Sequence, residues 1–212
     1  GENPDELEQE WELLNKAFAW DSTYLPAFVA AARFSLYEGD EVKADRWINQ
    51  GLELNDRYAD LYLQSANMTK LKRIKGIIDT EAGLKTEERF LQQAIQLEVD
   101  LMKQSEYITR LRDYYFENNN YLDAMTVARN YARQVPLLST YLKDQRDNMS
   151  AFANWLRGSI GYSSSSLDPM KELVQSKPQD YILIGQYADV LTAAGKYIQS
   201  ITELERAQKI LS

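Results

Sequence analysis

The chain has 212 residues, a formal net charge of −8 and neither cysteine nor histidine. The missing residue types exclude disulfides, zinc sites of the usual kind and every Ser-His catalytic triad. The excess of 32 acidic over 24 basic residues argues against a nucleic-acid partner, because phosphate binding needs a basic face.

The N-terminal part of the chain predicts one amphipathic helix over residues 5–20. Its apolar residues recur at helical spacing on one face, and they are Leu7, Trp11, Leu14, Ala17 and Phe18. The Asn3-Pro4 pair before it is a helix-start signal. No run of about 18 apolar residues occurs here or later, so we expect no membrane insertion.

Residues 25–58 predict two amphipathic helices, 26–38 and 41–54, folded back on each other. Gly39 can take the left-handed conformation that ends a helix, and Asp40 can cap the next helix. Small residues on the facing stripes, among them Ala32 and Gly51, allow the two helices to approach closely. The unit is 34 residues long.

Residues 59–101 predict a longer version of the same unit. Its first helix continues towards residue 77, a loop covers 79–83, and the return helix runs over 87–99. The resulting insertion, residues 70–86, carries a basic cluster made of Lys70, Lys72, Arg73 and Lys75. We interpret this cluster as a solvated helix face, which is the usual meaning of a charge run.

The rest of the chain predicts one regular hairpin, one irregular segment and a final hairpin. Residues 102–138 form the first, with a turn at three consecutive asparagines, 118–120. Residues 139–180 predict a long helix over 139–157, a flexible loop that includes Ser163–Ser166, and a short helix over 168–176 with Pro169 in its first turn. Residues 181–212 are a clean hairpin again.

The 34-residue hairpin resembles the tetratricopeptide repeat. The matching residues are Phe28, Ala32, Gly39, Ala44, Ile48, Gly51 and Leu54. The resemblance implies an all-α fold, a right-handed α-α superhelix of antiparallel helical hairpins with about 11 helices and no sheet. It implies a single repeat domain over residues 1–212. The expected divisions are a half repeat or cap over 5–24, repeats over 25–58, 59–101 and 102–138, an irregular unit over 139–180, and a repeat over 181–212.

The resemblance also implies that the first helix of each pair lines an inner groove. On that mapping the groove residues are Arg33, Tyr37, Gln64, Asn67, Lys70, Arg110, Asp113, Glu117, Gln186 and Asp189. The set is mixed in charge and lacks the basic row with which chaperone-binding members clamp a carboxylate terminus. We therefore expect a non-enzymatic scaffold that binds a protein or peptide of another class.

Two alternative functions stay open. The repeats could act as a structural spacer or assembly module within a longer polypeptide. Less favoured is an enzyme domain with a carboxylate site near the Ser163–Ser166 loop. No cofactor or metal ion is expected. The lack of cysteine fits cytoplasm and periplasm equally, so the compartment stays open.

The final predicted helix carries an apolar edge, made of Tyr197, Ile201, Leu204 and Ile210. Only one side of it can be buried against the preceding helix, and terminal repeats normally show a polar outer face. We expect that the natural polypeptide continues beyond this helix or that another chain covers it. In the second case weak self-association through the C-terminal helix follows.

Overall fold

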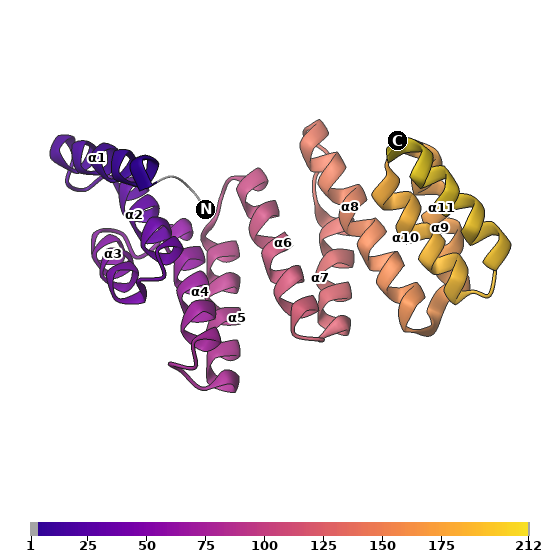
Figure 1. The fold of residues 1–212 in the computed structure, drawn as a ribbon, viewed down its shortest axis with the longest axis horizontal. Coiled ribbons are helices and arrows are strands. Elements are labelled where there is room, and N and C mark those ends of the chain that lie inside the picture. Colours follow the sequence, from indigo (N-terminus) through magenta and orange to yellow (C-terminus); the bar gives the residue numbers. More distant parts are fainter. Residues whose placement is uncertain (1–3, 212) are drawn as a thin grey trace. The chain divides into compact units, whose positions relative to one another are not determined.

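A computed structural model describes the backbone of residues 4–211 and the side chains of residues 9–161 and 165–211. All regular structure in this part of the chain is helical, with eleven α-helices and no strand (Figure 1), which confirms the predicted all-α fold. The chain divides into two compact units, one up to Tyr107 and one from Ile108. The division into repeats stays a prediction.

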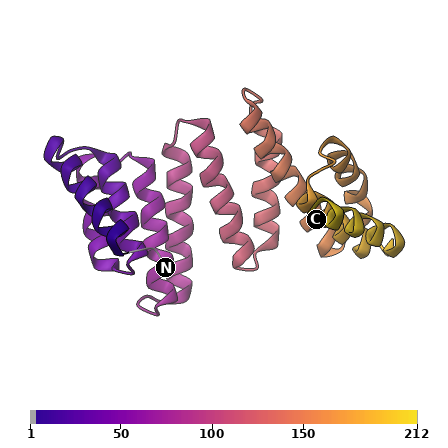
Figure 2. The ribbon, with the colours of Figure 1, turned by 45° about the horizontal axis from the view of Figure 1, so that its top comes forward.

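The first unit is built from helical hairpins. Its helices are α1 (Pro4–Trp20), α2 (Leu25–Tyr37), α3 (Glu41–Leu54), α4 (Ala59–Ile74), α5 (Thr80–Leu97) and the first part of α6 (Leu101–Glu117). Helices α2 and α3 form one hairpin, α4 and α5 form the next, and α4 packs on both α2 and α3 (Figure 2). Ala32, Ile48 and Met68 make the buried cluster that joins α2, α3 and α4.

The turn chemistry read from the sequence is present in both units. Gly39 has φ +74°, and the Asp40 side chain accepts a hydrogen bond of 2.9 Å from the Lys43 backbone N–H at the start of α3. In the second unit Asn119 has φ 60° and Asn120 caps α7. Asparagine tolerates this conformation better than most residues, so the triple asparagine ends one helix and begins the next.

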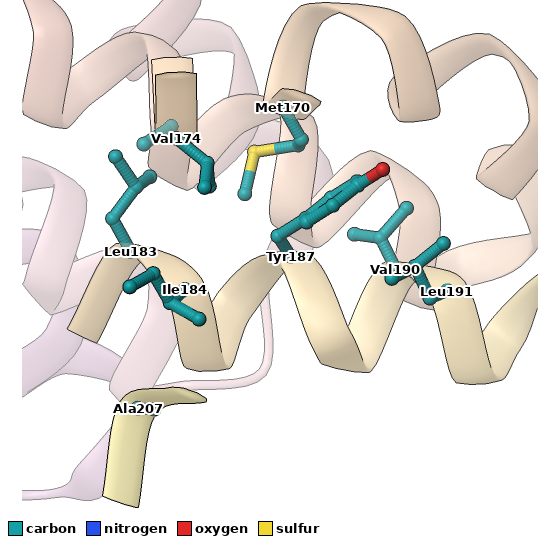
Figure 3. Packing of buried hydrophobic residues seen from close by; sticks show 9 residues of the cluster. Met170, Val174, Leu183, Ile184, Tyr187, Val190, Leu191 and Ala207 are labelled. Atoms are coloured by element: carbon teal, nitrogen blue, oxygen red, sulfur yellow. The ribbon is translucent and has the colours of Figure 1, made fainter. Parts of the chain in front are cut away.

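The second unit contains the rest of α6 and five further helices. These are α7 (Tyr121–Gln134), α8 (Thr140–Arg157), α9 (Ser163–Ser176), α10 (Tyr181–Ala193) and α11 (Tyr197–Leu211), with a kinked turn η1 (Gly158–Tyr162) between α8 and α9. Figure 3 shows the main core of this unit, where α10 is covered by α9 and α11. Its buried members include Met170, Val174, Ile184, Leu191 and Ala207.

The prediction of a flexible serine-rich loop was wrong. Helix α9 begins at Ser163, five residues earlier than expected, and Pro169 lies inside it rather than in its first turn. The interruption is confined to η1, where Gly161 has φ +108° and turns the chain sharply between the two helices. Ser166 is fully buried, so this part of the segment packs like a helix.

The loop predicted near 79–83 was also misplaced. Helix α4 ends at Ile74 and α5 begins at Thr80, so the connection is residues 75–79. The Asp79 side chain accepts a hydrogen bond of 3.0 Å from the Ala82 backbone N–H and caps α5. Gly83 is buried within α5, where the side chain of Arg73 lies against it. The segment 70–86 is therefore mainly helical.

The basic cluster at the end of α4 is only partly solvated: Lys75, just after the helix, is exposed, whereas Lys72 and Arg73 are half-buried. Lys72 lies 3.7 Å from the Asp45 carboxylate, and Lys75 lies 2.6 Å from that of Glu41. Arg73 donates from Nη2 to the Glu87 carboxylate at 3.0 Å, and both of these side chains are largely buried. These ion pairs connect α4 and the residue after it with α3 and α5, and only the largely buried Arg73–Glu87 pair is shielded from solvent.

Candidate binding groove

One face each of α6, α8 and α10 forms a groove of about 440 Å³ in the second unit. Thr109 and Arg112 on α6, Gln145, Asn148 and Phe152 on α8, and Leu183 and Gln186 on α10 are three or four positions apart, so they lie on the same side of their helix. The lining residues are Thr109, Arg112, Gln145, Asn148, Ala151, Phe152, Asp180, Ile182, Leu183 and Gln186. The groove is therefore partly polar and partly apolar.

Arg112 is held in one orientation in the groove. Its guanidinium carbon lies 4.5 Å from the centroid of the Phe152 ring, which is a cation–π contact. Nε and Nη2 both donate to Oδ1 of Asp113, at 2.8 and 2.5 Å, and Nη1 lies 3.6 Å from Sδ of Met149. These contacts fix the planar group before any ligand arrives, so little side-chain entropy is left to lose on binding.

Three carboxamide side chains line the same groove as Arg112. Those of Gln145, Asn148 and Gln186 form no hydrogen bond with any residue whose side chain the structure describes. A carboxamide both donates and accepts hydrogen bonds, as a peptide bond does. The groove therefore offers several unpaired donors and acceptors of the kind that a polypeptide backbone can satisfy.

An aromatic cluster keeps α6, α8 and α10 together at one end of this face. Phe116 lies 5.6 Å from Phe152 and 5.8 Å from Trp155, measured between ring centroids. The Trp155 indole donates from Nε1 to Oδ2 of Asp189 at 3.1 Å. Because the cluster joins all three helices, the spacing of the groove walls is fixed by packing within the unit.

Only some of the groove residues predicted in the second unit line this groove or contact a residue that does. Gln186 lines it, Asp113 holds Arg112, and Asp189 binds Trp155. Arg110 and Glu117 are exposed on α6 and are not among the lining residues. The prediction included no residue of α8, although Gln145, Asn148 and Phe152 recur there at spacings of three and four residues.

In the first unit the five predicted residues lie in different environments. Gln64 is only 5% exposed and accepts a hydrogen bond of 3.2 Å from Asn67. Arg33 and Tyr37 are exposed on α2, and Lys70 is half-buried on α4. The structure brings Gln64 and Asn67 together. A binding role for all ten predicted residues stays a prediction.

A hollow that the sequence did not suggest lies at the end of α1. It measures about 390 Å³ and is lined by Lys16, Ala17, Trp20, Asp21 and Tyr24. The hydroxyl and backbone N–H of Thr23 donate hydrogen bonds to the Asp21 carboxylate and lower its pKa below the ordinary aspartate value. Trp20 is almost completely exposed beside it.

Neither a candidate metal site nor a membrane-spanning helix is found in the described part of the chain. Among the side chains that the structure covers, no group of three or more acidic residues could hold a metal ion. None of the helices over residues 4–211 is long and apolar enough to cross a membrane. The carboxylate site considered near Ser163–Ser166 lacks the loop on which that prediction depended, because the backbone there is helical.

Comparison with known proteins rests on structure, since no protein-family model and no curated protein matches the sequence. YrrB, a TPR protein with an unusual peptide-binding site, is 11% identical with a TM-score of 0.60, over 93% of this chain and 91% of that one. MamA is 10% identical with a TM-score of 0.58, over 88% and 91%. The TPR-like repeats of a putative kinesin light chain from Podosopora anserina are 11% identical with a TM-score of 0.61, over 89% and 95%.

Each of these three structures matches most of this chain, and the descriptions of YrrB and of the kinesin light chain name TPR or TPR-like repeats. At identities of 10–11% such likeness concerns the fold and not the function. This chain has the fold of the tetratricopeptide-repeat proteins.

Proposed function

We propose that the chain is a non-enzymatic scaffold that binds a protein partner, and that an extended segment of the partner lies in the groove of α6, α8 and α10. The observation that carries the proposal is the set of three unpaired carboxamides, Gln145, Asn148 and Gln186, that line one groove together with an Arg112 held by its own contacts. The peptide-binding site described for YrrB, a protein of the same fold, supports the same class of ligand.

The chemistry of the groove favours an extended peptide over a small polar ligand. An extended chain presents one N–H and one C=O about every 3.3 Å, so a row of carboxamides can bind its backbone whatever its sequence. Ile182 and Phe152 supply apolar contacts for an occasional side chain. The volume of about 440 Å³ lies in the range of roughly 300–1,000 Å³ that is usual for ligand sites.

The proposal can be tested with a displayed library of random peptides. Peptides selected on the immobilised chain would be titrated against the triple variant Gln145→Ala, Asn148→Ala, Gln186→Ala. Each lost hydrogen bond is worth about 0.5–1.5 kcal/mol, so the triple variant should bind at least about tenfold more weakly. The matched control replaces two exposed amides of α7, Asn130→Ala and Gln134→Ala, and should bind as the unmodified chain does.

Two results would contradict the proposal. One is a library that yields no peptide binding above background. The other is a set of selected peptides that bind the triple variant and the unmodified chain equally well. Either result would favour the alternative function, a structural spacer or assembly module without a peptide ligand.

A further inference from the structure

Helix α11 presents an apolar stripe that its own unit does not cover. Four members, Tyr197, Ile201, Leu204 and Leu211, are between 49% and 63% exposed, and the neighbouring Ile198 is 83% exposed. The adjacent side of the helix is buried against α10 through Ser200 and Ala207. The exposed stripe is thus a second apolar side, distinct from the one that packs within the unit.

The spacing of the stripe indicates that its occupant is another helix. Tyr197, Ile201, Leu204, Gln208 and Leu211 follow one another at intervals of four, three, four and three residues. This alternation is the seam along which two helices pack side by side, with one polar position tolerated among the apolar ones. We call these five residues the α11 seam.

The α11 seam is held on a rigid support. The Ser200 hydroxyl donates to the backbone carbonyl of Ala188 on α10 at 2.9 Å and lies 2.8 Å from the Thr192 hydroxyl. Ala207, seven residues further along α11 and so two turns from Ser200, packs in the main core of the second unit (Figure 3). The seam cannot turn inward without breaking these contacts, so its apolar side chains stay at the surface.

The size of the exposed area suits two copies of the same helix. The exposed side chains of the seam and Ile198 together amount to roughly 600 Å², the upper end of what a monomer usually leaves uncovered in one patch. Two such faces would bury roughly 1,200 Å² in total, which is the lower limit of specific interfaces. An interface of this size predicts a dimer that dissociates on dilution.

The charges of α11 also permit a second copy. The whole chain has a formal net charge of −8, so two identical molecules repel each other in most relative orientations. Helix α11 itself has two acidic residues, Glu203 and Glu205, and two basic residues, Arg206 and Lys209, so it is formally neutral. Glu203 and Arg206 pair at 3.2 Å within the helix. Identical α11 faces can therefore meet without strong repulsion.

We infer that the α11 seam is a dimerisation surface whose occupant is the α11 seam of a second copy of this chain. In such a two-fold pair the same residues contact each other on both copies. Leu204 is the central residue of the seam, so it faces Leu204 of the second copy whether the two helices run parallel or antiparallel. This interface is separate from the groove of α6, α8 and α10.

Sedimentation at rising concentration tests the inference directly. The apparent molecular mass of the unmodified chain should rise from that of a monomer towards that of a dimer as its concentration approaches about 1 mM. The dimer dissociation constant of Leu204→Lys should be at least tenfold higher, because this substitution places a charge in the middle of the seam. The control is Thr202→Lys, an exposed position of the same helix outside the seam, and it should dimerise like the unmodified chain.

The lack of cysteine provides a second measurement. Under mild oxidation the Leu204→Cys chain should form a covalent dimer much faster than Thr202→Cys, because only the central seam position brings two copies within disulfide distance. The inference is overturned if the unmodified chain stays monomeric at every concentration, if Leu204→Lys dimerises equally well, or if the two cysteine variants cross-link at the same rate. The triple groove variant should dimerise normally, which separates this inference from the proposed function.

Discussion

Replacing Gly51 by alanine tests the closest helix contact of the first unit. Gly51 lies on α3 where this helix crosses α4. A Cβ atom added there would meet Leu61 Cδ1 at 2.7 Å and Phe28 Cβ at 3.2 Å. Leu61 is completely buried, so it cannot move its methyl group into solvent. Either the leucine leaves its rotamer or the two helices move apart.

Two opposing effects determine the size of the change. Alanine is favoured over glycine inside a helix by about 1 kcal/mol. Overpacking of a dense core costs about 1–3 kcal/mol, and a contact of 2.7 Å lies well inside normal van der Waals distance. The balance predicts that Gly51→Ala destabilises the chain by up to about 2 kcal/mol.

Urea unfolding followed by circular dichroism measures the difference, and Gly185→Ala serves as the matched control. Gly185 also lies inside a helix, α10, but a Cβ atom there would have no neighbour within 4 Å. The control should therefore stabilise its unit by up to about 1 kcal/mol. If Gly51→Ala raised the unfolding midpoint as much as the control does, α3 and α4 would be farther apart at this crossing than the structure shows.

Three further changes address other parts of the packing. Ala124→Leu should cost about 1–3 kcal/mol in urea unfolding, because Ala124 is fully buried on α7; an unchanged midpoint would contradict the packing. Glu87→Leu should cost about 3–5 kcal/mol, because it leaves the largely buried Arg73 charged and without the carboxylate that pairs with it; a thermal melt equal to that of the unmodified chain would refute this. Burial and the hydrogen bond to Asp60 raise the pKa of Tyr107 above its ordinary value. The folded state then holds this proton more tightly than the unfolded one, so stability falls as the pH rises above about 10, and Tyr107→Phe should reduce that fall.

Local signals in the sequence predicted most of the fold. The change from α2 to α3 depends on Gly39 and Asp40, whose roles follow from their own backbone and side-chain chemistry. Asn119 and Asn120 act in the same way between α6 and α7. Such features involve residues only a few positions apart. They can therefore be read without knowing what packs around them.

The errors occurred where distant contacts determine the structure. Serine composition predicted a loop around Ser166, but this residue is fully buried, and the packing of α9 on α10 extends the helix through it. The cations of α4 looked solvated because their partners, such as Asp45 and Glu87, come from helices far away in the sequence. Periodicity alone does not reveal such partners.

The residues that line the groove of the second unit overlap the predicted set only at Gln186. A family-based mapping assigned Arg110 and Asp113 to the groove, whereas the face of α6 that meets α8 carries Thr109 and Arg112. A shift of one residue along a helix turns a side chain by about 100°, so small errors of register exchange exposed and buried positions.

The groove and the α11 seam share one helix, and this suggests a last prediction. Helix α10 presents Gln186 to the groove and binds Ser200 of α11 through the carbonyl of Ala188. Coupling between two sites needs an element with two alternative arrangements. The side of α10 between them is densely packed, with Ile184 and Leu191 fully buried, and offers no second arrangement. A saturating groove peptide should therefore change the dimer dissociation constant by less than about fivefold in sedimentation. A larger change would mean that α10 moves when the groove is filled.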